Sequence, residues 1–373
     1  MIYLSLFNGI SAGRLALSRA GIKFDKYYIA EIDKFANKVS EFHYPDNIQL
    51  GDVNNWLEWD IDWSSVGLVT AGFPCQSWSL AGKQLGDKDE RGKLFWTTLE
   101  IMSHVLENNP DAKFMLENVK MKKEFEEYIT LHTERALGYV NKTLINSSLL
   151  SAQNRQRYYW TNFEVNQPED KGILLKDIID DDSITDREKS YCIDANYSKG
   201  TNLNQYFNKS RRQIVFRPCE PRENIKQSKD GLIHVANASD IKGNEQIKRI
   251  YSDAGKAPTL STCQGGHREP KVAIRDKSKT IRSSGRNSYD RHEWDSISNC
   301  HYRKLTPTEC ARLQTFPDGW CENIVSNSQS YKCYGNAWTV DVIAHIFRCA
   351  YRENKRAAIR PVVNYEQSCS ANI

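Results

Sequence analysis

Short apolar runs alternate with amphipathic stretches along the first 165 residues of the chain. Apolar runs bounded by turn residues predict strands, and apolar residues three or four positions apart predict helices. The predicted strands cover residues 2–7, 27–30, 66–71 and 113–116, with a weak strand before Gly51 and β-like runs near 139–150 and 156–163. The predicted helices cover residues 14–20, 34–43, 94–106 and 125–137. This alternation is typical of an α/β fold with a doubly wound, Rossmann-like parallel sheet.

The pattern changes between about residues 185 and 300, where Asn, Ser, Lys and Arg dominate and periodicity is weak. The sequence then predicts a helix over 305–317. Thr306 and Pro307 at its beginning are typical residues of a helix start. A last helix runs from Thr339 to about Ala350. We therefore expect a first domain over 1–185, a smaller, loop-rich domain over 186–329, and a return to the first domain over 330–373.

Composition favours a soluble globular protein. Hydrophobic residues make up 39% of the 373 positions and charged residues 26%. No apolar run approaches the roughly 20 residues of a membrane span, and the N-terminus lacks the basic region and cleavage site of a signal peptide. The ten cysteines form no Cys-x-x-Cys pair and no zinc-type spacing with the eight histidines. We expect a protein of the reducing cytoplasm without a structural metal.

Charge is unevenly distributed, although the net charge is only +4. Residues 199–312 contain 23 lysines and arginines against 12 aspartates and glutamates. A basic segment inside a mildly acidic chain indicates a polyanionic partner such as nucleic acid. The plainer alternative is a solvated surface with a chance excess of basic residues.

A cysteine follows the strand predicted at 66–71. Gly72, Phe73 and Pro74 end that strand, because proline has no N–H group for a sheet and fixes its own backbone angle. Cys75 is then the first side chain delivered to the carboxyl edge of the sheet, where ligands bind in open α/β folds. Cys75 is a candidate nucleophile, or a buried structural cysteine; the Pro-Cys-Gln tripeptide alone leaves both interpretations open.

The first turn and two acidic residues form a candidate ligand site. The sequence FNGISAG joins the first strand to the first helix, and small residues there let the backbone and the helix N-terminus approach a ligand. Glu31, which ends the second strand, suits both hydroxyls of a ribose, and Asp52 could accept from an adenine amine. The turn lacks Gly-x-Gly-x-x-Gly, so a nucleoside without a pyrophosphate is favoured over a dinucleotide. A tight turn without a ligand is the structural alternative.

Three further side chains complete a candidate catalytic group. Glu117 follows a strand at the same sheet edge as Cys75, and Arg155 and Arg157 share one side of their segment if it is extended. Together with the thiol, these residues provide a nucleophile, a proton donor and a pair of cationic hydrogen-bond donors. Each one alone is more often a helix cap or a solvated surface residue.

The order and spacing of these motifs match a known family. FNGISAG, AEID, GD, GFPCQSWSLAGK with ERGKLF, LENV, QNRQR, LTPTECARLQTFP and GNAWTVDVI occur in this order. The chain thus resembles the cytosine-5 DNA methyltransferases over nearly its whole length, except for about 185–300. Ser11 and Ala12 replace glycines that the family usually shows in the first turn.

The resemblance implies a covalent mechanism with S-adenosylmethionine as methyl donor. Cys75 would add as a thiolate to carbon 6 of cytosine, with Arg155 as a candidate for lowering its pKa. Glu117, kept protonated by a desolvated pocket, would bond the ring nitrogen, and Arg157 would hold the base carbonyl. Phe7 would pack on adenine, Glu31 bind ribose, and Asp52 the adenine amine. The full set expected at the cofactor is Phe7, Gly9, Ile10, Glu31, Ile32, Asp52, Val53, Pro74, Asn336 and Ala337.

The same resemblance implies duplex DNA as the partner, because a base must be flipped out of the helix to reach the thiol. Gln76, Ser79 and Lys83, in the loop that would close over the base, are expected to contact the DNA backbone. The basic second domain is expected to recognise the target sequence. Its candidate readers are Arg211, Arg212, Arg249, Arg268, Arg282 and Arg286. We expect a monomer, and a restriction endonuclease specific for the same site is a candidate partner.

Three other functions fit parts of the sequence. A tRNA cytosine methyltransferase of the same family would use the same catalytic residues, but the large basic insertion favours duplex DNA. A catalytically inactive DNA-binding regulator would keep the fold without an intact set of Cys75, Glu117, Arg155 and Arg157. A nicotinamide-dependent dehydrogenase is disfavoured by the first turn and by Pro-Cys-Gln.

Overall fold

A computed structural model of the chain describes residues 1–74, 90–199, 206, 209–218 and 300–352, and three short strands in the remaining basic segment. For residues 90–92 and for the short strands between 217 and 302, it describes the backbone only.

A seven-stranded sheet forms the centre of the molecule, in the order β3-β2-β1-β4-β5-β7-β6. The first five of these strands in spatial order are parallel, as the alternation of strands and helices predicts. The strands are β1 (Ile2–Leu6), β2 (Lys26–Ala30), β3 (Ile48–Gln49), β4 (Val66–Ala71), β5 (Lys113–Val119), β6 (Asn141–Asn146) and β7 (Gln156–Thr161). β1 joins the two halves of this sheet, and every one of its residues is buried.

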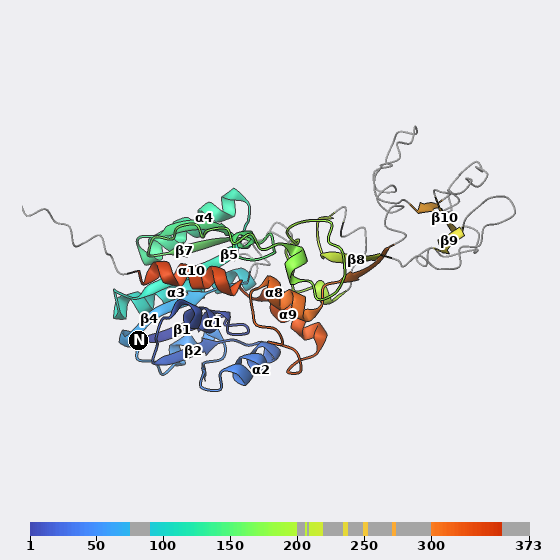
Figure 1. The fold of residues 1–373 in the computed structure, drawn as a ribbon. Coiled ribbons are helices and arrows are strands. Elements are labelled where there is room, and N and C mark those ends of the chain that lie inside the picture. The colour runs from blue at the N-terminus through green and yellow to red at the C-terminus, as the bar shows by residue number, and fades with distance from the viewer. Residues whose placement is uncertain are drawn as a thin grey trace, which may run out of the picture.

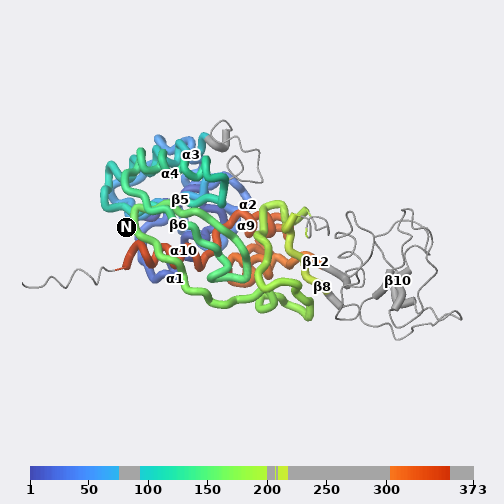
Figure 2. The backbone as a smooth tube through the Cα atoms, turned by 90° about the horizontal axis from the view of Figure 1, so that it is seen from above, coloured from blue at the N-terminus to red at the C-terminus, as the bar shows by residue number. Residues whose placement is uncertain are grey.

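Helices cover both faces of the sheet (Figures 1 and 2). On one face α1 packs against α10, and Tyr3 of β1 lies in the core between them. On the other face α3 packs against α4, over Leu4 and Leu6. The helices are α1 (Ala12–Ala20), α2 (Lys34–His43), α3 (Glu90–Asn108), α4 (Lys123–Leu137), α8 (Pro307–Leu313), α9 (Asn327–Asn336) and α10 (Val340–Ala350). Alternate residues of a buried strand therefore serve two separate cores.

The sheet departs from the prediction at one end, where β7 runs antiparallel to both β5 and β6. Only a short connection, 147–155, separates β6 from β7, and a parallel pair would need a longer crossover. β5 is also longer than predicted, so that Glu117 and Asn118 lie inside the strand rather than after it. The antiparallel register places Glu117 opposite Tyr159 and diagonal to Arg157.

The basic segment contributes two small sheets. β8 (Ile214–Pro218) pairs with β12 (Cys300–Lys304), and this ribbon leads away from the main body in Figure 1. β9 (His234–Asn237), β10 (Arg249–Ser252) and β11 (Lys271–Ala273) form the other sheet. Residues that follow the ribbon return to the main core, where Leu305 and Leu313 belong to the same hydrophobic cluster as Tyr3.

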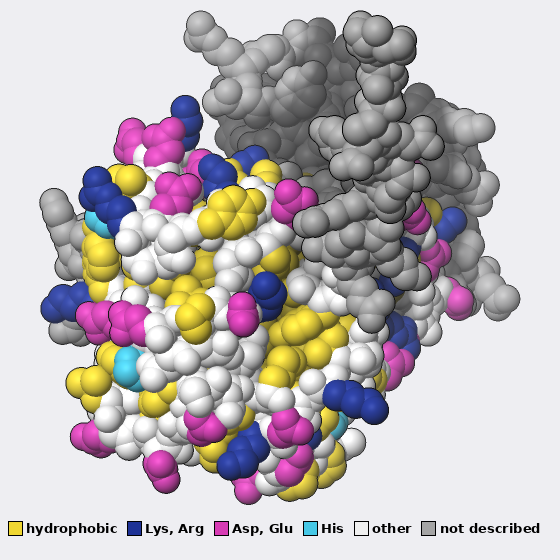
Figure 3. All heavy atoms as spheres, turned by 90° about the vertical axis from the view of Figure 1, so that its left-hand side faces the viewer, with side chains coloured by type: hydrophobic (Ala, Val, Ile, Leu, Met, Phe, Trp, Pro, Cys, Tyr) yellow, Lys and Arg dark blue, Asp and Glu magenta, His cyan; other side chains and the backbone are white. Residues whose placement is uncertain are grey.

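Acidic and basic side chains are interspersed on the face of the molecule that Figure 3 shows. The described part of that face therefore shows no large patch of only acidic or only basic side chains.

The helix start predicted at Thr306 and Pro307 is confirmed, with a buried carboxylate at its base. The Thr306 side chain accepts from the Glu309 N–H, and Glu309 Oε2 accepts from the Thr306 N–H at 2.7 Å. Glu309 is fully buried and also accepts from Arg303 Nη1 and Nη2, at 2.8 and 2.7 Å. This carboxylate thereby links β12 to the start of α8.

We expect Glu309→Gln to lower the free energy of unfolding by about 1–3 kcal/mol, because an amide N–H₂ at this fully buried position would replace a carboxylate oxygen that accepts from Arg303 or Thr306. Arg303 would keep its ion pair with Asp181. Chemical denaturation of the purified variant measures this. Glu134→Gln, an exposed position of α4, is the control and should change stability by less than about 0.5 kcal/mol. Equal stabilities of the two variants would contradict the account of Glu309.

Candidate functional site

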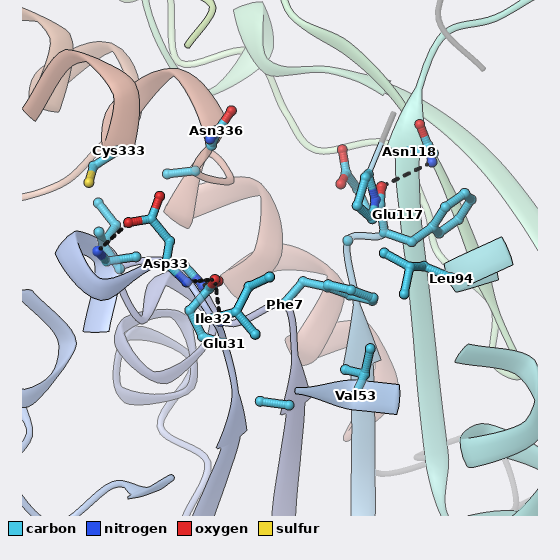
Figure 4. A pocket seen from close by; sticks show the side chains of 18 of the residues that line it. Phe7, Glu31, Ile32, Asp33, Val53, Leu94, Glu117, Asn118, Cys333 and Asn336 are labelled. Carbon is cyan, nitrogen blue, oxygen red and sulfur yellow. Dashed lines mark hydrogen bonds between the residues drawn. The ribbon is translucent and has the colours of Figure 1, made fainter. Parts of the chain in front are cut away.

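A cavity of about 400 Å³ opens at the carboxyl ends of the parallel strands (Figure 4). Glu31, Ile32 and Asp33 lie on one side of it and Glu117 with Asn118 on the other, with Phe7 between them. This size and mixture of apolar walls and a few polar groups are typical of a small-molecule site. The position at the strand ends is the one expected for ligands in open α/β sheets.

All ten residues predicted to contact a cofactor line this cavity. Glu117, Arg155 and Arg157 line it as well, so the cofactor set and three members of the catalytic set share one space. The structure thus brings together residues that lie as far apart in the chain as Phe7 and Ala337. The individual roles of these residues stay predictions.

The first turn has an unusual backbone. Phe7, Gly9 and Ser11 all have positive φ angles, of 55°, 57° and 63°. Non-glycine residues rarely adopt this conformation, and it is found most often at functional sites. The buried Ser11 hydroxyl lies 2.7 Å from Ser40 Oγ and accepts from Asn8 Nδ2 at 3.0 Å. These bonds offset the cost of serine where the family usually shows glycine.

Glu31 fixes the turn by accepting backbone hydrogen bonds at both carboxylate oxygens. Oε2 accepts from the Gly9 N–H at 2.8 Å, and Oε1 accepts from the N–H groups of Ile32 and Asp33 at 2.9 and 2.8 Å. These bonds use three of the about four lone-pair sites of an ionised carboxylate and leave one site, on Oε2. Glu31 can therefore hold the loop and still accept from one ligand hydroxyl.

Asp52 also lines the cavity, at the start of a short 3₁₀ helix, η1 (Val53–Glu58). Its Oδ1 accepts from the backbone and side-chain nitrogens of Asn54, each at 2.9 Å. The apolar side chains of Phe7, Val53 and Leu94 line the cavity nearby. Apolar walls with carboxylates at their rim fit the flat base, amine and ribose of an adenine nucleoside.

An ion pair that the sequence analysis missed crosses the rim of the cavity. Lys332 of α9 donates to Asp33 Oδ2 at 2.6 Å, while Asp33 Oδ1 caps α2. Burial raises the pKa of Asp33, but hydrogen bonds from Lys332 and from the backbone of Phe35 and Ala36 lower it more, so that it lies below its ordinary value. The pair is separated by 299 residues in sequence, and no local pattern could have predicted it.

Glu117 is held by two donors inside the cavity. Arg157 Nε lies 3.0 Å from Glu117 Oε1, and Trp338 Nε1 donates to Oε2 at 3.0 Å. The Glu117–Arg157 contact follows from the antiparallel register, because diagonal residues share a face of the sheet. Asn118 ties the end of β5 to the neighbouring loop by donating to the carbonyl oxygen of Phe73 at 3.3 Å.

Arg155 is almost fully buried and organises the backbone around the cavity. Its Nη2 donates to the carbonyl oxygens of Gly335 and Ala337, at 3.2 and 3.0 Å. Its Nη1 donates to Ile193 O at 3.1 Å and to Cys192 Sγ at 3.3 Å. A structural role in fixing the segment 335–337 is therefore visible for this arginine, in addition to the role predicted beside Cys75.

Two further cysteines that the sequence analysis did not single out lie at or close to the cavity: Cys333 lines it, and Cys192 contacts Arg155. Burial raises the pKa of the Cys192 thiol, but the charges of Arg155 and Arg157 outweigh burial, so that the pKa lies below its ordinary value.

Several predicted residues lie outside the described part of the chain. These are Cys75, Gln76, Ser79, Lys83, Arg268, Arg282 and Arg286, together with the side chain of Arg249. The chain is described up to Pro74, which lines the cavity and directly precedes Cys75 in sequence. Of the predicted DNA contacts, the exposed Arg211 lies 3.5 Å from Asp194, and Arg212 is half-buried with a positive φ.

Comparison with known proteins identifies the family. The model of the C-5 cytosine-specific DNA methylases matches residues 1–351. The chain belongs to this family. It is therefore a DNA cytosine-5 methyltransferase, and its methyl donor is S-adenosylmethionine. The composition of the cavity described above agrees with a donor that carries an adenosine group.

Two relatives span this methyltransferase nearly completely. It is 28% identical to the orphan methyltransferase M.SPBetaI of Bacillus phage SPbeta, over 92% of this chain and 96% of that protein. It is 29% identical to the type II methyltransferase M.HhaI of Haemophilus parahaemolyticus, over 92% of each chain. Among solved structures, the Entamoeba histolytica methyltransferase EhMeth shares the fold, with a TM-score of 0.57 and 14% identity over 94% of this chain and 98% of that one.

Within the described residues, no cluster of His, Cys, Asp or Glu could hold a metal ion. In the same part of the chain, no helix is long and apolar enough to cross a membrane.

Proposed function

We propose that this methyltransferase modifies cytosine within a specific duplex DNA sequence through a covalent bond between Cys75 and the flipped base. The observation that carries the proposal is that Glu31, Asp52, Glu117, Arg157 and Pro74 all line the same cavity. It combines groups suited to a nucleoside cofactor with groups suited to a polar base, at the end of the strand that leads to Cys75.

The cofactor half of the cavity would hold S-adenosylmethionine through this chain's own side chains. Glu31 would accept from a ribose hydroxyl and Asp52 from the adenine amine, while Phe7 and Val53 would pack on the adenine ring. Asn336, exposed at the end of α9, would meet the methionine end together with the backbone at Gly9. These assignments rest on cavity lining and chemical fit.

The other half of the cavity would act on the base. The Cys75 thiolate forms a bond to carbon 6, and Glu117 supports the electron shift through a hydrogen bond to the ring nitrogen. Bound S-adenosylmethionine would supply the electrophilic methyl group that carbon 5 accepts, and would be left as S-adenosylhomocysteine. Transfer of the carbon 5 proton to water and cleavage of the bond between Cys75 and carbon 6 then restore the double bond and release the thiolate. Arg157, already beside Glu117, would hold the carbonyl oxygen of the base.

Glu31→Ala should weaken S-adenosylmethionine binding about 10- to 100-fold, because it removes a charged acceptor for the ribose and releases the Gly9 turn. Isothermal titration calorimetry gives the dissociation constant. Glu41→Ala, an exposed position of the neighbouring helix α2, is the matched control. Equal affinities of the two variants would exclude Glu31 from the cofactor site.

Duplex DNA is the substrate that the charge distribution supports, because the excess of basic residues lies in the segment between QNRQR and LTPTEC. In this scheme residues 1–185 and 330–373 belong to the catalytic domain. The target recognition domain, expected over 186–329, would end before Leu305, because residues from Leu305 to Ile324 pack in the same hydrophobic cluster as Tyr3. We further propose a cytoplasmic monomer. A cognate restriction endonuclease would be the functional partner if the enzyme works as a type II methyltransferase.

Methyl transfer from tritiated S-adenosylmethionine to plasmid DNA and to tRNA tests this substrate directly. We expect label in the plasmid as 5-methylcytosine, and bisulfite sequencing of the same plasmid should show one recurring sequence context. Label confined to tRNA, or cytosines methylated without a common context, would overturn the proposal of a specific duplex site.

A further inference from the structure

The indole of Trp338 reaches the carboxylate of Glu117 from the opposite side to Arg157. Trp338 Nε1 donates to Glu117 Oε2 at 3.0 Å, and Arg157 Nε lies 3.0 Å from Oε1. Glu117 comes from β5, whereas Trp338 lies between α9 and α10, 221 residues further along the chain. The two donors hold the two oxygens separately, and so fix the plane of the carboxyl group.

Gly72 makes room for this contact. A Cβ atom at Gly72 would lie 2.8 Å from Trp338 Nε1, closer than real Cβ atoms approach, and 3.0 Å from Glu117 Oε2, closer than most do. Gly72 is not among the residues with a positive φ, so its backbone does not require glycine. The absence of a side chain is instead explained by the approach of the indole and the carboxylate.

The backbone on both sides of Trp338 is anchored. The Ala337 carbonyl oxygen accepts from Arg155 Nη2 at 3.0 Å and from Gln314 Nε2 at 3.2 Å. The Thr339 hydroxyl lies 2.8 Å from Gln314 Oε1 and 2.9 Å from Ser147 Oγ. The indole therefore projects from a fixed segment, and its N–H group has a defined position relative to β5.

We propose that Trp338 is a positioning residue that orients Glu117 for its contact with the cytosine ring. The last side-chain torsion of glutamate, χ3, takes a wide range of values. A single donor at Oε1 would therefore let the carboxyl group rotate and move Oε2 away from the plane needed for the base contact. The indole N–H restrains that oxygen, while each oxygen keeps a second site for a proton or a base edge. This inference rests on the proposed function, in which Glu117 contacts the base.

Trp338→Phe keeps an aromatic ring and removes the N–H group. We expect kcat for methyl transfer to fall about tenfold, as loss of one hydrogen bond to a charged group predicts. The KM for DNA and the dissociation constant of S-adenosylmethionine should stay within about twofold, because Trp338 acts through Glu117. Trp160→Phe is the matched control, since its indole N–H bonds Thr130, at 2.8 Å, rather than Glu117.

A double-mutant cycle separates orientation from general structure. In single-turnover measurements on a Glu117→Gln background, Trp338→Phe should slow methyl transfer by less than about twofold, because the group that it positions is already gone. A further tenfold loss on that background would overturn the inference. Should Trp338→Phe fail to fold, Gly72→Ala separates the same two groups from the other side and should show the same non-additivity.

The proposed function and this inference fail in different ways. Normal methyl transfer by Glu117→Gln alone would refute the role of Glu117, and with it the inference. A large loss in Glu117→Gln together with an unchanged kcat in Trp338→Phe would refute the positioning role only.

Discussion

Cys75→Ser should transfer methyl groups at least about 10³-fold more slowly than the wild-type enzyme. A serine hydroxyl is almost entirely protonated near neutral pH, whereas a thiol beside cationic groups ionises readily and is the better nucleophile. The substitution replaces one atom, so the dissociation constants of S-adenosylmethionine and DNA should stay within about twofold of the wild type. Single-turnover kinetics with labelled S-adenosylmethionine measure the chemical step.

Cys349→Ser provides the matched control for that experiment. Cys349 is half-exposed at the end of α10, where its thiol donates a hydrogen bond to Asn166 Oδ1. It is not among the residues that line the cavity. Its substitution makes the same change of sulfur to oxygen and should leave the rate within about twofold. Undiminished turnover in Cys75→Ser would exclude covalent catalysis by this residue.

Glu117→Gln is the second substitution with a large expected effect, a fall in kcat of about 10²- to 10⁴-fold. Oε1 of Glu117 forms an ion pair with Arg157, and Oε2 accepts a hydrogen bond from Trp338. A glutamine must turn its N–H₂ group toward one of these two donors, and it cannot exchange a proton with the base. The loss should appear in kcat and kcat/KM together, because the interaction strengthens in the transition state.

A second buried glutamate controls for the change in charge. Glu126 of α4 is 6% exposed, close to the 7% of Glu117, and pairs with Lys142 rather than with cavity residues. Glu126→Gln should keep kcat within about twofold once the folded fraction is taken into account. Similar losses of kcat in both variants would mean that Glu117 contributes only to folding.

The sequence was most informative where local chemistry determines structure. The bounds predicted for the strand before Cys75 and for the helix after Asp33 agree with β4 and α2, because Gly72 to Pro74 and the Asp33 cap mark those ends. The residues that line the cavity were named from two sources: Glu31 and Asp52 from their places after strands that end at one edge, and the others from the family resemblance. Glu31 and Asp52 could be placed there without any knowledge of their contacts.

Contacts between distant segments could not be predicted in this way. The Lys332–Asp33 pair and the Trp338–Glu117 bond depend on how α9 and α10 pack against the sheet. α9 itself was missed, because the polar run from Asn327 carries little hydrophobic periodicity and its helix is set by tertiary packing. The antiparallel course of β7 was missed although the sequence contained its signal. Only residues 151–155 separate the two predicted β-like runs, which is too short for the crossover of a parallel pair.

Covalent capture on DNA tests the central claim most directly. The measurement uses duplex DNA that carries 5-fluorocytosine at the position mapped by bisulfite sequencing, since fluorine prevents the final loss of a proton from carbon 5. With S-adenosylmethionine present, we predict a one-to-one complex that survives denaturation, and peptide mapping should place the DNA on Cys75. A complex that maps to another residue, or none at all from an enzyme that methylates the unmodified duplex, would contradict the account.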